Sequence, residues 1–216
     1  MPDLTQLALY FAAALVLAVA PGPGIFYVAA RTLAGGRAEG VASSFGTGVG
    51  GLVHVLAGSL GVSAIVLASA ELFTTLKFVG AAYLIWLGFR TFLSARRERL
   101  AGLDGETAAT AIGPGRAFRE GALVEALNPK TAGFFLAFIP QFVDPSAGHV
   151  ALQFVVLGSV SVTLNTIADV VVAFAASGIR KGAAARPALI RRLQEASGAA
   201  MIALGVGLAF AKRPAN

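Results

Sequence analysis

The sequence predicts an all-α integral membrane protein with six transmembrane helices. Hydrophobic residues make up 56% of the 216 residues, charged residues only 13%, and the mean hydropathy is +0.77. Apolar surface on this scale needs lipid as its solvent. The same composition excludes a disordered chain, and the absence of Cys excludes a disulfide scaffold.

Six segments are long and apolar enough to span a bilayer, which takes about 20 mostly apolar residues. They are rich in Ala, Leu, Val, Phe and Gly and lack the alternation of strands, which favours helices. The segments cover residues 4–30, 41–70, 72–93, 117–142, 150–177 and 196–211. They fill most of the chain, so residues 1–216 are predicted to form one transmembrane domain.

Lys and Arg residues gather on one side of the predicted bundle. Thirteen of the 17 lie in or beside the connections between helices one and two, three and four, and five and six. This excess places those connections in the cytoplasm and both termini outside. Topology and anionic lipid then explain the net charge of +6, and no nucleic-acid partner is expected.

The longest connection, residues 94–116, is rich in Gly and contains Pro114. We expect a mobile cytoplasmic connector there. It would join two halves of the transmembrane domain, at about 1–95 and 117–211.

The first and fourth spans each contain a run that breaks helices. Pro removes a backbone donor and clashes with the preceding turn, and Gly adds backbone freedom. The two runs lie 108 residues apart, which is half the length of the chain. The residues are Pro21, Gly22, Pro23 and Gly24 in the first span, and Asn128, Pro129 and Lys130 in the fourth.

The matched breaks predict two inverted repeats of three helices each, the design of secondary transporters whose broken helices meet at a substrate site. Opened helix ends offer N–H groups to an anion and carbonyls to a cation, which suits an amino-acid zwitterion. We therefore expect the residues of both runs to bind substrate. The alternative is that both are ordinary Pro kinks without a role.

Ionisable side chains within spans are costly and mark functional sites by default. His54 shares a helix face with Gly46, Gly50 and Gly58, which places it at a helix contact. His54 is a candidate for proton coupling because its side chain titrates near neutral pH. The other interpretation is a structural His bonded to a neighbouring carbonyl.

A polar stripe on the fifth span carries Ser161, Asn165 and Asp169 at intervals of four residues. The stripe predicts that these side chains face the bundle interior. We expect Asn165 to contribute to the substrate site and Asp169 to be a second candidate for proton coupling. Alternatively, Asp169 is simply hydrated near the cytoplasmic end of its helix.

Glu125 and Lys130 flank the break of the fourth span. On an ideal helix they would lie about 140° apart, so they do not pair unless the break rotates one toward the other. Lys130 could neutralise a substrate carboxylate, or satisfy helix ends or Glu125. Glu125 is a third candidate for proton coupling, and Asn128 is expected to cap the reopened helix.

Several short motifs stand together in a specific order. They are Pro21-Gly22-Pro23, the stretch from Arg31 to Gly40, the stripe from Gly46 to His54, the run 77–84, the stretch from Gly121 to Lys130, and the runs 134–138 and 140–142. In these residues the sequence resembles the LysE/RhtB-type amino-acid exporters, over about residues 4–208.

This resemblance implies an exporter of amino acids in the bacterial inner membrane, with six helices and driven by the proton gradient. Gly24 departs from the pattern, since family members often carry Asn or another residue there. Substrates vary widely within the family, so the particular amino acid is not implied.

Three alternatives remain at this stage: an exporter of a cation or another small metabolite, a membrane subunit that transports nothing, and an intramembrane enzyme. The enzyme is disfavoured because the sequence has no nucleophile arrangement and no H-E-x-x-H motif. No ATP-binding loop is present, and no cofactor or metal is expected. The expected partners are an amino-acid substrate and membrane lipid, and a homo-oligomer is left open.

Overall fold

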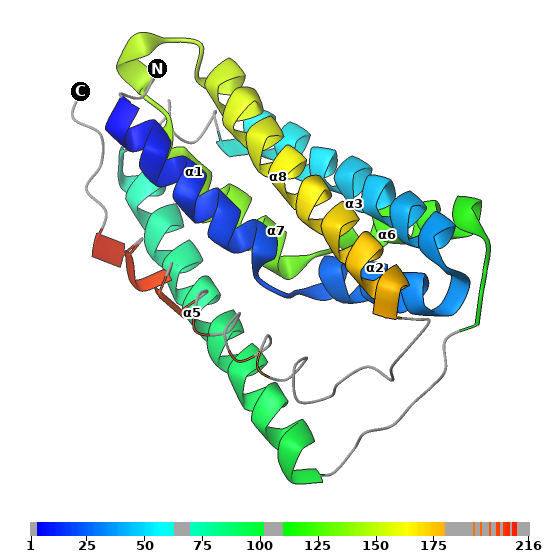
Figure 1. Cartoon of the computed structure of the whole chain (residues 1–216). Helices are drawn as coiled ribbons and strands as arrows, with labels where there is room; N and C mark the ends of the chain where they lie inside the picture. Colours follow the sequence, from blue (N-terminus) through cyan, green and yellow to red (C-terminus); the bar gives the residue numbers. More distant parts are fainter. Residues whose placement is uncertain are drawn as a thin grey trace.

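The structure is a computed structural model that describes residues 4–62, 70–101, 110–179 and single positions between 192 and 210. Within this part of the chain every regular element is a helix (Figure 1). The longer ones are α1 (Leu4–Val19), α2 (Pro23–Gly35), α3 (Arg37–Ala57), α5 (Ala70–Ala101), α6 (Pro114–Ala126), α7 (Pro129–Gly133) and α8 (Val150–Ile179).

Short turns of other helix types extend these elements. The π-helical turn η1 (Gly58–Val62) continues α3. The π-helical η2 (Phe134–Phe138) and the 3-10 turn η3 (Ile139–Phe142) continue α7. The 3-10 turn η4 (Pro145–Ala147) follows in the loop before α8. There Asp144 accepts hydrogen bonds from Ser146, which hold the pKa of its carboxyl below the ordinary value.

Both predicted helix breaks are present. The axis bends by 44° between α1 and α2 and by 41° between α6 and α7. At the first break Gly22 is extended and Pro23 begins α2. At the second, Asn128 is extended and Pro129 begins α7. A Pro at the first helical position is tolerated because its missing N–H would have no partner there.

Two helices in the described part of the chain, Arg37–Gly61 and Val150–Gly178, are long and apolar enough to cross a membrane. The number rises to four if each bent pair counts as one span. These findings support a multi-pass helical membrane protein. Half of the positions of the predicted sixth span, residues 196–211, lie outside the described residues. The count of six helices and the inverted repeats therefore stay predictions.

The connector predicted over residues 94–116 is shorter in the structure. Helix α5 runs on to Ala101, because residues 94–101 contain neither Gly nor Pro and favour a helix. Helix α6 begins at Pro114, after Gly113 in a left-handed conformation with φ 83°. The middle of the predicted connector, residues 102–109, lies outside the described residues.

Helix α3 packs against α6 and α8. Its glycines allow this approach, as the small-residue face of the sequence predicts. A Cβ at Gly46 would collide with the backbone of Phe118, and one at Gly50 with that of Ala122. On the side of α8, a Cβ at Gly51 would lie 3.0 Å from Val162.

The two ends of the bundle have different elements. The starts of α1, α5 and α8 lie at one end, and the α2–α3 junction, the start of α6 and the end of α8 lie at the other (Figure 1). Helix α5 packs on η2 and α7 and diverges from the other helices along its length. The broken helices thus meet in the middle of the bundle, between the two ends just described.

Candidate functional site

Lys130 lies at the break of the first helix, although it belongs to the second broken helix. Its side chain is buried, and Nζ donates to the carbonyl oxygens of Leu17 (3.1 Å) and Ala20 (2.8 Å). The break deprives these carbonyls at the end of α1 of intrahelical partners. A cation is stabilised there by the negative end of the helix dipole. Gly22 leaves room, because its Cβ would lie 3.1 Å from Lys130 Cε.

Glu125 occupies the opposite side of the same break. Its Oε2 accepts from Asn128 Nδ2 (2.8 Å) and its Oε1 from Thr131 Oγ1 (2.5 Å). A Cβ on Gly24 would lie 2.6 Å from Glu125 Oε2, so the carboxylate packs against the first turn of α2. An anion is stabilised at this position by the positive end of the helix dipole.

The second broken helix therefore supplies one charge to each opened end of the first. Glu125 and Lys130 do not form an ion pair with each other, in agreement with their predicted separation around the helix. The predicted cap is also present, since Asn128 Oδ1 accepts from the backbone N–H of Lys130 at 3.0 Å.

Asp169 is buried between α3 and α8, with 4% of its surface exposed. That burial does not fit an Asp simply hydrated at the end of a helix. Its Oδ2 lies 2.7 Å from Thr47 Oγ1, and Glu125 and Lys130 are near enough for their charges to act on it. Sequence reasoning missed Thr47, although it stands four residues after Ser43 on a helix whose buried polar residues could have marked it.

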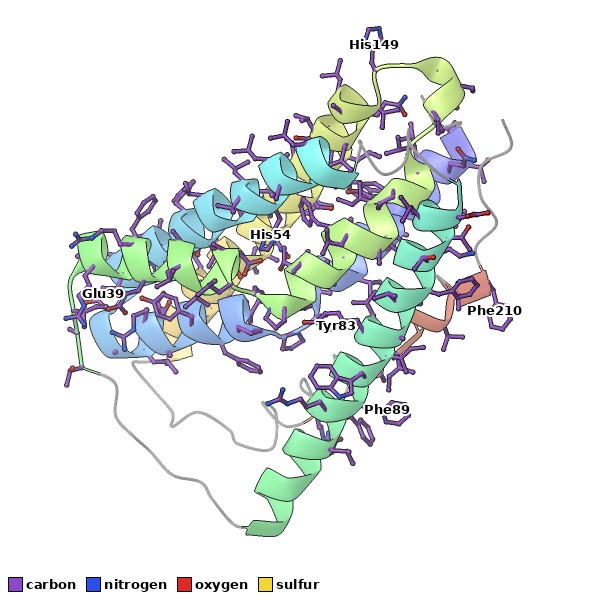
Figure 2. The ribbon with its side chains drawn as sticks, turned by 180° about the vertical axis from the view of Figure 1, so that it is seen from behind. Glu39, His54, Tyr83, Phe89, His149 and Phe210 are labelled. Carbon is purple, nitrogen blue, oxygen red and sulfur yellow. The ribbon has the colours of Figure 1, made fainter. Side chains whose placement is uncertain are left out.

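His54 is half-buried at the point where α6 ends (Figure 2). Its Nε2 lies 2.9 Å from the carbonyl oxygen of Glu125. A carbonyl cannot donate, so His54 is the donor in this contact. The structure thus places His54 in the arrangement expected of a structural His, and also beside the break.

The remaining predicted residues surround this centre. Asn165 is half-buried on α8, one turn before Asp169. Ser161 confirms that the polar stripe faces the interior, because it lies 2.6 Å from the buried hydroxyl of Tyr10. Pro21 is buried in the first break, while Pro23 is exposed and Pro129 is half-buried. Among the described residues, no group of three or more His, Asp or Glu side chains could hold a metal ion.

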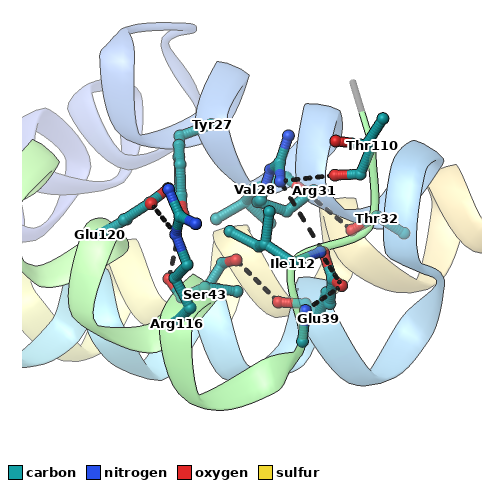
Figure 3. A network of polar contacts seen from close by, with 12 residues as sticks. Tyr27, Val28, Arg31, Thr32, Glu39, Ser43, Thr110, Ile112, Arg116 and Glu120 are labelled. Atoms are coloured by element: carbon teal, nitrogen blue, oxygen red, sulfur yellow. Dashed lines mark hydrogen bonds and ion pairs between the residues drawn. The ribbon is translucent and has the colours of Figure 1, made fainter. Parts of the chain in front are cut away.

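A third buried carboxylate, Glu39, was not singled out from the sequence. Its Oε1 accepts from the backbone N–H groups of Ile112 (2.8 Å) and Gly113 (2.7 Å), just before α6 (Figure 3). Its Oε2 has no hydrogen-bond partner within the described part of the chain and lies 4.0 Å from Arg31 Nη1, which donates to the carbonyl of Thr110. This contact joins the α2–α3 junction to the segment that leads into α6.

Other polar contacts lie at the same end of the bundle. Arg116 Nε donates to Glu120 Oε1 at 2.7 Å, and the Tyr27 hydroxyl lies 3.1 Å from Glu120 Oε2 (Figure 3). The Tyr27 contact links α2 to α6 beside the Glu39 contact.

Comparison with known proteins gives a family and several relatives. The family model of the LysE type translocators matches residues 15–212. A protein of Vibrio cholerae named as an uncharacterized membrane protein is 32% identical over 204 residues, covering 94% of this chain and 96% of its own length. No solved structure gives a significant match.

Two further relatives have names that state a transported molecule. The homoserine/homoserine lactone efflux protein of Salmonella typhimurium is 29% identical over 204 residues, covering 94% of this chain and 95% of the relative. The leucine efflux protein of Klebsiella pneumoniae is 27% identical over 158 residues, covering 73% of this chain and 71% of the relative.

Proposed function

This chain belongs to the family of LysE type translocators, and we propose that it exports amino acids or close derivatives across the bacterial inner membrane, coupled to the proton gradient. The names of the two efflux relatives support this substrate class. So does the arrangement of charges at the first helix break.

The observation that carries the proposal is the pair of opened helix ends, each beside one charged side chain. Lys130 sits on the carbonyls at the end of α1, and Glu125 sits at the start of α2. An amino acid carries the same two charges. Its ammonium group can bind the carbonyls of Leu17 and Ala20 once Lys130 moves away from them.

Lys130 then neutralises the substrate carboxylate. A buried ammonium group without a partner costs several kcal/mol, so Lys130 needs an acceptor at every stage. In the absence of substrate the α1 carbonyls are that acceptor, and with substrate bound the carboxylate replaces them. The backbone from Pro21 to Gly24 and the side chain of Asn165 complete the site.

Proton coupling is assigned to Asp169 ahead of His54 and Glu125. Asp169 lies beside a hydroxyl and within the influence of both charged groups at the break. His54 instead donates to a main-chain carbonyl, and both oxygens of Glu125 accept side-chain hydrogen bonds. Replacing Asp169 by Asn should abolish proton-driven export and leave much of the substrate exchange in reconstituted vesicles.

The proposal is tested by growth of cells with and without the protein, in the presence of toxic concentrations of single amino acids and their analogues. The wild-type chain should confer resistance to one or a few of them, and Lys130→Met should remove that resistance at equal membrane abundance. Lys77→Met is the matched control, because Lys77 lies on α5 away from the breaks. Resistance to a metal cation alone, or none at all, would contradict the proposal.

The proposed topology places the α2–α3 junction and the start of α6 in the cytoplasm, with both termini outside. The concentration of Arg and Lys in those connections supports it. Reporter fusions after Arg97 and at Asn216 should report opposite compartments. Finding both reporters on the same side would overturn the six-span arrangement.

A further inference from the structure

The hydroxyl group of Thr47 makes two short contacts but has only one hydrogen to donate. Thr47 Oγ1 lies 2.7 Å from the carbonyl oxygen of Ser44, one turn back in α3, and 2.7 Å from Asp169 Oδ2 on α8. Both Thr47 and Asp169 are almost completely buried, at 3% and 4% exposure. Buried polar atoms with such short contacts are expected to be hydrogen-bonded.

The number of hydrogens available for these two contacts depends on whether Asp169 is protonated. An ionised carboxylate and a carbonyl oxygen can only accept, so the single Thr47 hydrogen then serves one contact. A protonated Asp169 donates to Thr47 Oγ1, and Thr47 donates to Ser44 O. Only the protonated form satisfies both contacts at once.

Among the groups around Asp169, the Thr47 hydroxyl is the one whose hydrogen bonds change when Asp169 gains or loses its proton. Thr47 reaches Asp169 from α3, while Glu125 of α6 and Lys130 of α7 act on it through their charge. Thr47 also borders the break itself, since a Cβ on Gly24 would lie 3.8 Å from Thr47 Cγ2.

We infer that Thr47 is a positioning residue for proton coupling, whose hydroxyl hydrogen turns from the Ser44 carbonyl to Asp169 when Asp169 loses its proton. The inference rests on the proposed function, in which Asp169 carries the coupled proton. The proton leaves Asp169 Oδ2 for water on one side of the membrane and is replaced from water on the other. Thr47 itself keeps its hydrogen throughout.

Three substitutions test the inference. Thr47→Val has nearly the same shape but no hydroxyl group, and Thr47→Ser restores the hydroxyl group. Thr32→Val is the matched control. Thr32 is fully buried and donates to the carbonyl of Val28 in the preceding turn of its helix, and among the described residues no carboxylate is its hydrogen-bond partner.

The first measurement is infrared difference spectroscopy of the reconstituted protein during a pH titration. We expect a titrating carboxylic-acid band that is absent in Asp169→Asn. The band should shift in Thr47→Val and stay unchanged in Thr47→Ser and Thr32→Val. A band in Thr47→Val identical to that of the wild type would overturn the inference, whatever the transport data show.

The second measurement is transport in vesicles, with the amino acid to which the wild-type chain gives the strongest resistance as the probe. In Thr47→Val the proton-driven flux should fall about tenfold, which is the factor expected for the loss of one hydrogen bond to a charged group. Substrate exchange at equal pH should change little, and Thr47→Ser should restore the driven flux. If Asp169→Asn retains proton-driven transport, the proposed coupling site is wrong. If only Thr47→Val retains it, with an unchanged pH profile, the role of Thr47 alone is wrong.

Discussion

The two ends of helix α2 each lie against a buried glutamate, and the two glutamates have different partners. At the start of α2, Glu125 packs against Gly24 and accepts from the side chains of Asn128 and Thr131. At the other end, Glu39 packs against Gly35 and accepts from two backbone N–H groups. Both are almost fully buried, so burial does not distinguish them.

Helix dipoles act on both glutamates, because each lies between the end of one helix and the start of another. A carboxylate is favoured at the start of a helix and disfavoured at its end. Glu125 lies in the last turn of α6 but beside the start of α2, and it is held by the side chains of Asn128 and Thr131. Glu39 lies beside the end of α2 but in the first turn of α3, and it is held by fixed backbone donors with Arg31 nearby. We therefore propose that the type of partner, movable side chains or fixed backbone, separates the acid of the transport site from the acid that stabilises the fold.

The largest effect is expected from Glu125→Gln. Removing this charge leaves Lys130 and the start of α2 without their nearby anion, and losses of about 3 kcal/mol or more follow when one buried charge is left uncompensated. Transport should fall on the order of hundredfold, since each 1.4 kcal/mol is about a factor of ten.

The measurement is the initial rate of export by vesicles with equal amounts of folded protein. Glu120→Gln is the control, because Glu120 lies on the same helix and pairs with Arg116 at the surface. Near-normal export by Glu125→Gln would show that the two glutamates have the same kind of role.

Glu39→Ala should lower the stability of the folded protein and leave transport nearly unchanged. It leaves the N–H groups of Ile112 and Gly113 without their acceptor, at a cost of about 2 kcal/mol. Thermal unfolding in detergent should occur at a lower temperature, while the KM of the remaining folded protein stays within about threefold, below the 1.4 kcal/mol of a tenfold change. Glu39→Gln should lose less stability because its amide oxygen still accepts. A large change in KM at unchanged stability would place Glu39 in the transport site.

The sequence predicts the positions of both breaks and the close face of α3, because these depend on local chemistry. Pro and Gly break a helix wherever it packs, and a glycine stripe permits close packing against any neighbour. The cap by Asn128 is equally local, since donor and acceptor are two residues apart.

The partners of the buried charges could not be predicted in the same way. Lys130 donates to carbonyls that precede it by more than a hundred residues, and Asp169 of α8 contacts Thr47 of α3. Such contacts depend on how the bent helices pack. Glu39 was missed for the same reason, because its donors lie in an irregular segment far along the chain.

A smaller effect is expected from adding one methyl group at each end of α2. In Gly24→Ala the new Cβ would lie 2.6 Å from Glu125 Oε2, so the carboxylate must move. Overpacking of this kind costs about 1–3 kcal/mol. For Gly24→Ala we expect this cost as a rise in KM of about tenfold, because 1.4 kcal/mol corresponds to that factor.

Gly35→Ala is the matched variant at the other end, where the new Cβ would collide with Glu39. It should lower the unfolding temperature and leave KM nearly unchanged. An equal rise in KM for both variants would remove the distinction between the two ends of α2.

The smallest effect is expected from His54→Gln, and it sharpens the assignment within the break. His54 donates to the main-chain carbonyl of Glu125, and the amide of Gln can donate in its place. Loss of an ordinary hydrogen bond costs about 1 kcal/mol, and Gln should keep part of it. The expected loss is therefore below the 1.4 kcal/mol that corresponds to a tenfold change. Export by His54→Gln should stay within about threefold of the wild type, with an unchanged pH profile.

The pH profile of proton-driven export in vesicles is the decisive measurement. If His54→Gln abolishes the driven flux and keeps exchange, while Asp169→Asn does not, the coupled proton resides on His54. The carbonyl contact would then be the resting state of a proton carrier, and the Glu125 end of α2 would act through its main chain as well as its carboxylate.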